Sequence, residues 1–571
     1  MRDPSREDPA VLHLMRVTIE AVSPLSFGSG ERVLLRRRRR AEGRVVEEDK
    51  FEIALVRDAN ELPTIPGATL QGVLRQLYAD ECGSAETRDL FGFAEGSNGS
   101  AARLSVGFGC VHDREGRSIE RLVTNATRIS DDPVLSSLRR TAPVTRDHVA
   151  LNARHVSDGR KKFERPALPV GTRFSIEFSL WGLRSEAESD KQKLERVAQL
   201  FRHPVLRLGG SGRRGYGKVI LVRASHALPA LDNTQALRSL REQAASRSLA
   251  DAIATNASRR RRGVVQATLS LTPINVWRIG GRSVPVTEMT HGVRLPDGST
   301  AQQNGVDLRH AVNADGSRKV RDADDIATLA RETIIRWVRH GEVERAELVE
   351  ATAESPFDPA RPRAVPFAIP GSAIKGPLAH RAVFHWNCGR ANGERLIDVE
   401  QWLQLGPADR ERRLAAYRDW AKRPEDLELL LGAAKERDSD EGRASRVFVD
   451  DGSAAEARAV QAIDHSSIDR FTGGVRAGFL FVEEVIVGGR IEVEIFILPP
   501  LQEAATGTSP RDWSGPIRDA FLKALRDLCE GRLAIGAKSL GFCTGTVTWG
   551  GDPAQTEAWQ RAWDSLSRPS A

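Results

Sequence analysis

The sequence has 571 residues and a formal net charge of +7, with 40% hydrophobic and 28% charged residues. This length predicts two or three domains. Because it contains neither an apolar leader nor a run of 18 apolar residues, we expect a cytoplasmic protein without membrane contacts. The five cysteines form no C-x-x-C pair, which argues against a disulfide framework and against a structural zinc site.

The first predicted element is a strand that ends in Pro and Gly, VTIEAVSPLSFGSG, at residues 17–30. A basic run of five arginines follows at 36–40, and then the acidic stretch EGRVVEEDKFEIALVRD. The turn TIPGATLQG at 64–72 leads into a predicted helix, and SIEFSL at 175–180 alternates as a half-buried strand does. One face of that helix is apolar and carries Leu70, Val73, Leu74, Leu77 and Tyr78.

The most unusual stretch is LRLGGSGRRGYGKV at 206–219. Glycine loses much chain entropy on folding, so this composition indicates a sharp turn or a close approach to a partner. The stretch lacks the Walker spacing and precedes a strand, which argues against a nucleotide-binding loop. Arg213 and Arg214 supply charge, and we expect Tyr216 to stack on a base. With the arginine runs, the stretch indicates a polyanion, most simply nucleic acid; a purely structural turn is the alternative.

A polar connector is predicted at 224–263, helical in pattern and ending in four arginines. In the second half, an insertion at about 282–365 includes a predicted extra helix at 322–341. In AIPGSAIKGPLAH, Pro377 predicts that the next helix begins at Gly376. Residues 371–376 would then form a phosphate-accepting turn beside Lys375, or a turn required only for packing. The last predicted helix carries an apolar face of Ile517, Phe521, Leu525 and Leu528.

Four landmarks recur in the same order, which indicates a tandem duplication; two unrelated α+β domains with similar turns are the alternative. They are the opening strand, the IPG turn, an Asp-His pair followed by a strand (Asp147-His148 and Asp464-His465), and the glycine loop. The third landmark repeats with an offset of 317 residues. The element order β-α-β-β-α-β predicts an α+β fold of two ferredoxin-like domains, at 1–223 and 264–571, joined by the connector at 224–263.

Three motifs together resemble the RAMP superfamily: IPG-x-x-[LI]-[KQ]-G, D-H-x-x-[LI]-[ND] and LGG-x-G-RRGYGK. Within it, the chain is similar to a tandem fusion of two Cas-seven-type backbone domains of type III CRISPR effector complexes, like the double-backbone subunit of the III-D variant. The resemblance covers residues 14–222 and 264–549. The second glycine loop departs from the motif at Lys538, Leu540 and Cys543.

This resemblance implies RRM-like domains, each with a β-hairpin thumb, that stack along a guide RNA (crRNA). The implied partners are the guide, a complementary target RNA and other type III effector subunits. We expect the thumbs within 147–169 and 464–486, and the glycine loops on the guide backbone. The predicted RNA-binding residues are Gly67, Gln71, Arg75, Arg154, Arg160, Lys161, Gly210, Arg213, Arg214, Tyr216, Lys218, Gly371, Ser372, Lys375, Arg470, Arg476 and Lys538.

The resemblance also implies an acidic residue after the first strand that promotes metal-dependent cleavage of the target RNA. Asp49 is the first candidate and Glu52 the second, and Asp297 and Asp307 are candidates in the second half. Such a carboxylate can hold Mg²⁺ or orient the attacking 2′-hydroxyl or water. A solvated acidic loop is the alternative.

Two other functions stay open at this point. The chain can be a non-catalytic scaffold that binds the guide while neighbouring subunits cut. It can also be a guide-processing ribonuclease that needs no metal and uses His148 or His465 as a general base. A histidine beside an aspartate is, however, more often a structural hydrogen-bonding pair.

Overall fold

The computed structural model describes most of the chain. The described residues are those outside 1–8, 42–43, 126, 152–156, 229–262, 286–290, 295–299, 304–324, 330–331, 342, 351–367, 391–402, 413–423, 434–441, 470, 501–512, 514, 537–539 and 567–571. They form two compact units that follow the two predicted halves, with two exceptions. Thr333–Val349 from the second half belongs to the first unit, and Asp147–Phe163 from the first half belongs to the second unit.

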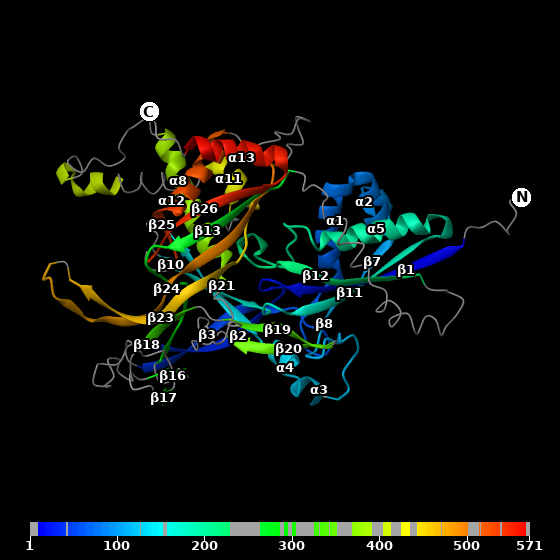
Figure 1. Cartoon of the computed structure of the whole chain (residues 1–571), viewed down its shortest axis with the longest axis horizontal. Coiled ribbons are helices and arrows are strands. Elements are labelled where there is room, and N and C mark those ends of the chain that lie inside the picture. Colours follow the sequence, from blue (N-terminus) through cyan, green and yellow to red (C-terminus); the bar gives the residue numbers. More distant parts are fainter. Residues whose placement is uncertain are drawn as a thin grey trace, which may run out of the picture. The chain divides into compact units, whose positions relative to one another are not determined.

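The first unit is built on a largely antiparallel sheet with the strand order β12-β1-β11-β8-β4, in which β7 also pairs with β11. Its strands are β1 (Ala10–Ala21), β4 (Thr64–Ile65), β7 (Leu104–Val106), β8 (Gly109–Val111), β11 (Arg173–Leu183) and β12 (Val219–Ala227). Its helices are α1 (Gly67–Cys82), α2 (Ser84–Phe91), α3 (Thr127–Ser130), α4 (Pro133–Leu138) and α5 (Ala187–Leu200). Helices α1 and α5 lie on one face of the sheet (Figure 1).

Alternation in β1 explains this layering. Every second side chain from Val11 to Ala21 is buried, and Met15, Val17 and Ile19 are fully enclosed. They pack with Leu70, Leu74 and Tyr78 of α1, so the predicted apolar face of that helix is confirmed.

The second unit repeats this topology with the order β26-β13-β24, to which β22 adds on the far side of β24. Its strands are β13 (Val265–Pro273), β14 (Val276–Trp277), β15 (Gly280–Pro285), β16 (His291–Arg294), β17 (Thr300–Gln303), β18 (Asp325–Leu329), β21 (Ala368–Ile369), β22 (Val447–Val449), β23 (Gly452–Ile468), β24 (Val475–Ile497), β25 (Glu530–Ile535) and β26 (Gly541–Gly551). Its helices are α8 (Gly371–Arg390), α11 (Glu425–Leu431), α12 (Gly515–Cys529) and α13 (Pro553–Leu566). The prediction of a mixed α+β fold with two sheet-bearing bodies is thus confirmed.

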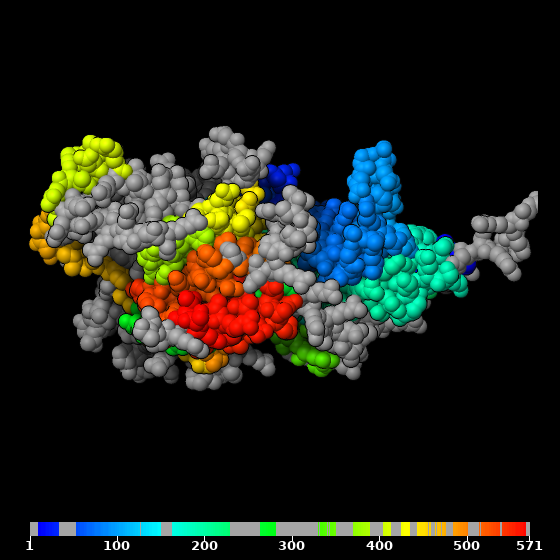
Figure 2. Space-filling view, turned by 90° about the horizontal axis from the view of Figure 1, so that it is seen from above, coloured from blue at the N-terminus to red at the C-terminus, as the bar shows by residue number. Residues whose placement is uncertain are grey.

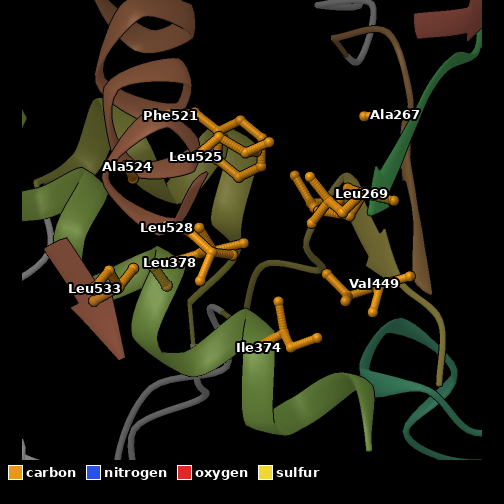
Figure 3. Packing of buried hydrophobic residues seen from close by; sticks show 14 of the residues in the cluster. Ala267, Leu269, Ile374, Leu378, Val449, Phe521, Ala524, Leu525, Leu528 and Leu533 are labelled. Atoms are coloured by element: carbon orange, nitrogen blue, oxygen red, sulfur yellow. The ribbon is translucent and has the colours of Figure 1, made fainter. Parts of the chain in front are cut away.

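The core of the second unit lies between its sheet and α8 and α12. Figure 3 shows Phe521, Leu525 and Leu528 of α12 facing Leu269 of β13, with Ile374 of α8 below them. This confirms the predicted apolar face of α12. Figure 2 shows the outer side of the helix layers, with α13 in red beside α12 in orange, and α1, α2 and α5 in blue to teal.

Several antiparallel strand pairs in the described part of the chain are hairpins. They are β2 (Gly28–Ala41) with β3 (Arg44–Leu55), β9 (Val144–Leu151) with β10 (Ser157–Ala167), β19 (Thr333–His340) with β20 (Val343–Glu350), and β23 with β24; a short pair, β5 (Phe93–Glu95) and β6 (Asn98–Ser100), follows α2. The hairpins β9–β10 and β23–β24 occupy the two spans where thumbs are predicted.

Two sequence predictions are wrong in this region of the fold. The described part of 322–341 forms strands β18 and β19 and no helix, because its β-branched residues pair with neighbouring strands. Helix α8 begins at Gly371 and continues through Pro377. Strand β12 extends to Ala227, four residues into the predicted connector at 224–263, and residues 229–262 of that connector lie outside the described part of the chain. The bounds of the connector stay a prediction.

The glycine of each IPG turn has a packing role. A Cβ on Gly67 would lie 2.2 Å from the Val106 carbonyl oxygen, and one on Gly371 would lie 2.1 Å from that of Val449. Each helix therefore starts against the backbone of the adjacent strand, where only glycine fits.

We predict opposite effects for two alanine substitutions in α1. Gly67→Ala forces the helix away from Val106 and should destabilise the first unit by about 1–3 kcal/mol. Gly72→Ala is the matched control, because a Cβ there meets nothing within 4 Å and should stabilise the same helix by up to about 1 kcal/mol. Urea denaturation, monitored by hydrogen exchange at amides of the first unit, measures the stability change in both variants. Equal effects of the two variants would contradict this packing argument.

Candidate nucleic-acid interface

The glycine loop of the first unit is a compact turn held against the chain that follows β1. Gly210 N donates to Ser26 O at 2.8 Å, Gly217 N to Pro24 O at 3.0 Å, and Lys218 N to the Ser23 hydroxyl at 2.9 Å. Across the loop, Leu208 N donates to Gly217 O at 2.9 Å. These bonds fix the backbone of 208–218 as one rigid element.

Three glycines of this loop, Gly209, Gly215 and Gly217, adopt a backbone that other residues rarely take. Gly209 has φ +84° and would place a Cβ 2.5 Å from Ser26 O, and Gly217 has φ +83° and would place one 2.5 Å from Leu208 O. The glycines thus permit the turn itself, which is one of the two reasons that the composition suggested.

Arginines from three separate segments surround the loop. The Arg146 guanidinium of β9 lies over the Tyr216 ring, 5.2 Å from its centroid. Arg165 of β10 lies beside Gly210, and its Nη1 would be 3.0 Å from a Cβ placed on that glycine. The Arg207 side chain packs under Gly212. With Arg213 and Arg214 of the loop itself, five guanidinium groups gather at this one turn.

Burial sets the character of these groups. Arg146 and Arg207 are almost fully buried, and burial lowers the pKa of the Arg213 guanidinium. Arg165 Nε is enclosed without a hydrogen-bond partner among the described residues, and Arg214 is exposed and makes no ion pair with any of them. A partly desolvated cluster of guanidinium groups favours an anionic ligand with several oxygens, such as a phosphate.

The position of Tyr216 argues against the predicted stacking on a base. Its side chain is fully buried, beneath Arg146. Lys218 is partly buried at the end of the loop, and its carbonyl oxygen accepts the Val22 amide. The exposed part of the loop is therefore its glycine backbone and its arginines.

The second half lacks arginine at the positions that correspond to Arg146 and Arg165. With the offset of 317 residues, Ile463 stands in place of Arg146 and Val482 in place of Arg165. Its equivalent turn lies between β25 and β26, where a Cβ on Gly536 would meet Arg278 O at 2.1 Å. The buried Arg278 forms an ion pair with the buried Glu483, so its charge is balanced within the protein.

Comparison with known families decides which family this is. The model of the RAMP superfamily matches residues 18–220 and 366–542, about two thirds of the chain. The chain belongs to the RAMP superfamily. Membership implies ferredoxin-like domains and a CRISPR protein that binds crRNA. A search of curated proteins finds no match. None of the helices in the described part of the chain is long and apolar enough to span a membrane.

The two matched segments are consistent with tandem RAMP domains. The second match begins just before the IPG turn, and the opening strand of that half lies outside it. The structure supplies the strand as β13, at the centre of the second sheet.

At the IPG turns of the RAMP segments, the predicted phosphate contacts find other partners. Gly371 N donates to Asp451 Oδ1 at 2.9 Å, and Lys375 Nζ donates to Ser445 Oγ at 2.9 Å and to Val447 O at 2.6 Å. Ser372 is partly exposed on the first turn of α8. Gln71 is partly exposed and Arg75 is exposed, both on α1. Their contact with RNA stays a prediction.

The acidic stretch after β1 forms strand β3 of a hairpin. In β3, Asp49 pairs in register with Arg36, Glu48 with Arg37 and Glu47 with Arg38, whereas Glu52 stands opposite Val33. The arginine run and the acidic stretch therefore face one another across one hairpin, which is a pairing that the sequence reading missed. Asp297 and Asp307 lie outside the described residues.

The register places no second carboxylate directly opposite Asp49 or Glu52. Among the described residues there is no group of three or more His, Cys, Asp or Glu side chains that could hold a metal ion. Asp49, the first candidate, has a cation as its cross-strand neighbour.

The two candidate histidines have structural neighbours. The ring of His148 stacks on Phe163 with centroids 5.0 Å apart, and His465 Nε2 lies 2.7 Å from the buried Glu483 carboxylate. A carboxylate can orient a basic histidine, although this one also pairs with Arg278.

The remaining predicted RNA contacts lie on the two thumbs and the second glycine loop. Arg160 and Lys161 are on β10, and Arg476 is on β24. Arg154, Arg470 and Lys538 lie outside the described residues.

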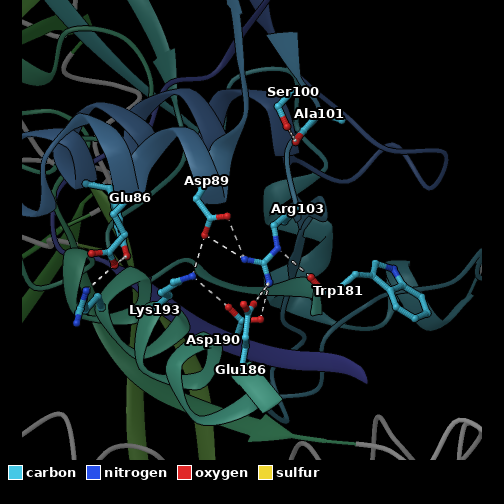
Figure 4. Close-up of polar contacts among 11 residues, drawn as sticks. Glu86, Asp89, Ser100, Ala101, Arg103, Trp181, Glu186, Asp190 and Lys193 are labelled. Carbon is cyan, nitrogen blue, oxygen red and sulfur yellow. Dashed lines mark hydrogen bonds and ion pairs between the residues drawn. The ribbon is translucent and has the colours of Figure 1, made fainter. Parts of the chain in front are cut away.

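A separate charged cluster in the first unit carries no ligand site. Figure 4 shows Arg103 between Asp89 and Asp190, with Lys193 closing the group. Arg103 donates to Asp190 at 2.5 Å and to Asp89 at 3.0 Å, and Lys193 Nζ donates to Asp89 at 2.8 Å. These cations lower the pKa of Asp89 and keep it ionised, so the cluster holds α2 against α5.

Proposed function

We propose that this chain is a guide-binding backbone subunit of a type III CRISPR effector complex. In this proposal it acts with crRNA, a complementary target RNA and further effector subunits. The observation that carries it is the RAMP match in two segments, one of which includes the arginine-surrounded loop. We place the guide backbone at that loop, on the first unit.

The chemistry of the loop suits an RNA backbone. Guanidinium groups bind phosphate oxygens through paired N–H donors, and a rigid glycine backbone lets the sugar-phosphate chain approach closely. Since the buried Tyr216 offers no stacking face, the contact depends on phosphates and is independent of base sequence. Such a contact fits a subunit that must accept many different guides.

Cleavage of the target RNA is the finer part of the proposal. The carboxylates of β3 lie opposite the run of five arginines at 36–40 of β2, so a general base and cations that can balance phosphate charge lie on the same hairpin. A scaffold without catalysis and a histidine-dependent, metal-free guide nuclease are the competing outcomes.

Replacing loop arginines should weaken guide binding and reduce its salt dependence. We expect the variant R165Q/R213Q/R214Q to bind a labelled guide on the order of 100-fold more weakly at 0.15 M salt. The slope of log K against log [salt] should become shallower by about 2, because each lost phosphate contact removes about 0.7. Fluorescence anisotropy of the full chain over a salt series measures both quantities.

The matched control is R412Q/R561Q, which removes two exposed arginines of the second half. This control should leave affinity and slope close to those of the unmodified chain. The same loss per removed arginine in both variants would indicate attraction by net charge alone and would contradict a guide site at the loop.

A further inference from the structure

The insertion of the second half supplies a hairpin to the first unit. Strands β19 and β20 belong to the first unit although they follow β18 in the chain. Ile335 N donates to Val170 O, and Ala346 N donates to Arg114 O, both at 2.8 Å. The side chains of Ile335 and Ala346 are 3% and 2% exposed and are part of the first unit's core. The hairpin is thus packed as an internal element and not as a surface decoration.

A charged and aromatic clamp fixes the hairpin to the turn before β11. Trp337 Nε1 donates to Gly171 O at 2.8 Å, and the Arg173 guanidinium lies 3.9 Å above the indole ring. Arg173 also donates to Glu344 at 2.6 Å and to Glu20 at 2.8 Å. Its hydrogen bond to Glu344 lowers the pKa of that carboxyl group. Arg173 therefore joins the hairpin to β1 within the first unit.

The tandem repeat shows what this indole does. The turn before β11 corresponds to residues 486–490 of the second half, where Gly488 takes the place of Gly171. Gly488 O accepts a hydrogen bond from Trp277 Nε1, also at 2.8 Å. Trp277 follows the opening strand of its own unit, whereas residues 22–30 of the first half contain no tryptophan. The equivalent carbonyl group thus accepts an indole N–H in both units. In the second unit the tryptophan belongs to the same half of the chain, and in the first unit it comes from the insertion of the second half.

The clamped turn directly follows β10, the strand that carries Arg165. Pro166 O accepts a hydrogen bond from Ser26 Oγ at 3.0 Å, and Leu168 pairs with Leu25. Ser26 O in turn accepts the Gly210 amide of the glycine loop. A short run of backbone, 165–171, therefore has the hairpin at one end and the arginine-surrounded loop at the other.

We propose that the β19–β20 hairpin is a docking element by which the second half completes the first unit and holds Arg165 in position at the glycine loop. Its docking surface consists of the turn at 114–116 and the turn at 169–173. Trp337 is a positioning residue, because it acts on the loop through the turn and contacts no RNA. The docking stands on its own geometry, and only its effect on RNA rests on the proposed function.

Hydrogen exchange of the full chain tests the docking. Trp337→Ala, and the milder Glu344→Gln, should speed amide exchange at 165–173 and 206–218 at least tenfold, while α12 of the second unit stays unchanged. Glu347→Gln is the matched control, because Glu347 pairs with Arg336 inside the hairpin at 3.2 Å and does not touch the clamp. Unchanged exchange in the first unit for both E344Q and W337A would overturn the proposal, as would an equal effect of E347Q.

Guide affinity gives a second, separable readout. W337A should weaken binding of a labelled guide RNA without changing the salt slope, because all phosphate-contacting side chains remain. The loop variant R165Q/R213Q/R214Q should change the slope. If the loop variant has no effect on RNA while W337A still speeds exchange, the proposed function fails and the docking stands. If the loop variant acts and W337A leaves affinity unchanged, the positioning role is overturned.

Discussion

Replacing Glu52 by glutamine in the assembled effector complex is expected to remove one product band from a guide-complementary labelled RNA while guide binding persists. The reason is the register of the β2–β3 hairpin. Glu52 faces Val33 across the hairpin, whereas Asp49 faces Arg36, so Glu52 is the candidate without a cross-strand cation. A carboxylate that removes the proton of an attacking 2′-hydroxyl contributes about 10²–10⁴-fold, enough to erase a band in a timed assay.

Asp49→Asn is the second arm of this experiment, and Glu47→Gln is its control. The family resemblance puts Asp49 first, whereas the strand register favours Glu52, so the two variants compare these two candidate carboxylates directly. Assays with Mg²⁺ and with EDTA separate a carboxylate that works through a cation from one that works alone. An unchanged band pattern in both variants would clear this hairpin of catalysis and leave a scaffold or a nuclease acting through the second half.

The repeat and the helical faces were predictable because their signals are local. Apolar residues at helical spacing identify the buried faces of α1 and α12 whatever the rest of the chain does. The landmarks of the duplication recur in both sheets, where β1 and β13 take the same central place.

The errors have non-local causes. Residues 333–340 fit a helical pattern, yet Ile335 and Trp337 obtain their hydrogen bonds from a turn more than 160 residues away. Likewise, Pro377 suggested a helix start, but the close contact of Gly371 with β22 fixes that start earlier. Tertiary contacts override local preference in both cases.

The candidate site was found only in part for the same reason. Arg213 and Arg214 stand within the glycine motif and could be read from it. Arg146 and Arg165 lie on β9 and β10, 40 to 70 residues earlier in the chain, and only the fold brings them to the loop. The 317-residue offset was a usable signal, because it contrasts these arginines with Ile463 and Val482.

This contrast leads to an expected result for the buried ion pair of the second unit. Arg278→Ala leaves the fully buried Glu483 without its guanidinium partner and should destabilise that unit by about 3–5 kcal/mol. The double variant R278M/E483L removes both charges and should lose much less. Arg526→Ala breaks a partly exposed pair between α12 and Glu530, the first residue of β25, and should cost about 0.5 kcal/mol or less.

Urea denaturation, monitored by hydrogen exchange at amides of the second unit, measures the stability of these three variants. If R278A is no less stable than R278M/E483L, the buried Glu483 carboxylate does not need the Arg278 guanidinium as its partner. RNA binding extends the test. Since Arg278 is neutralised inside the protein, R278M/E483L should keep the salt slope of guide binding, whereas loss of the loop arginines should reduce it. If R278M/E483L also reduces the slope, the second unit contacts phosphates as well, and the charge asymmetry between the two halves does not assign guide contact to the first unit alone.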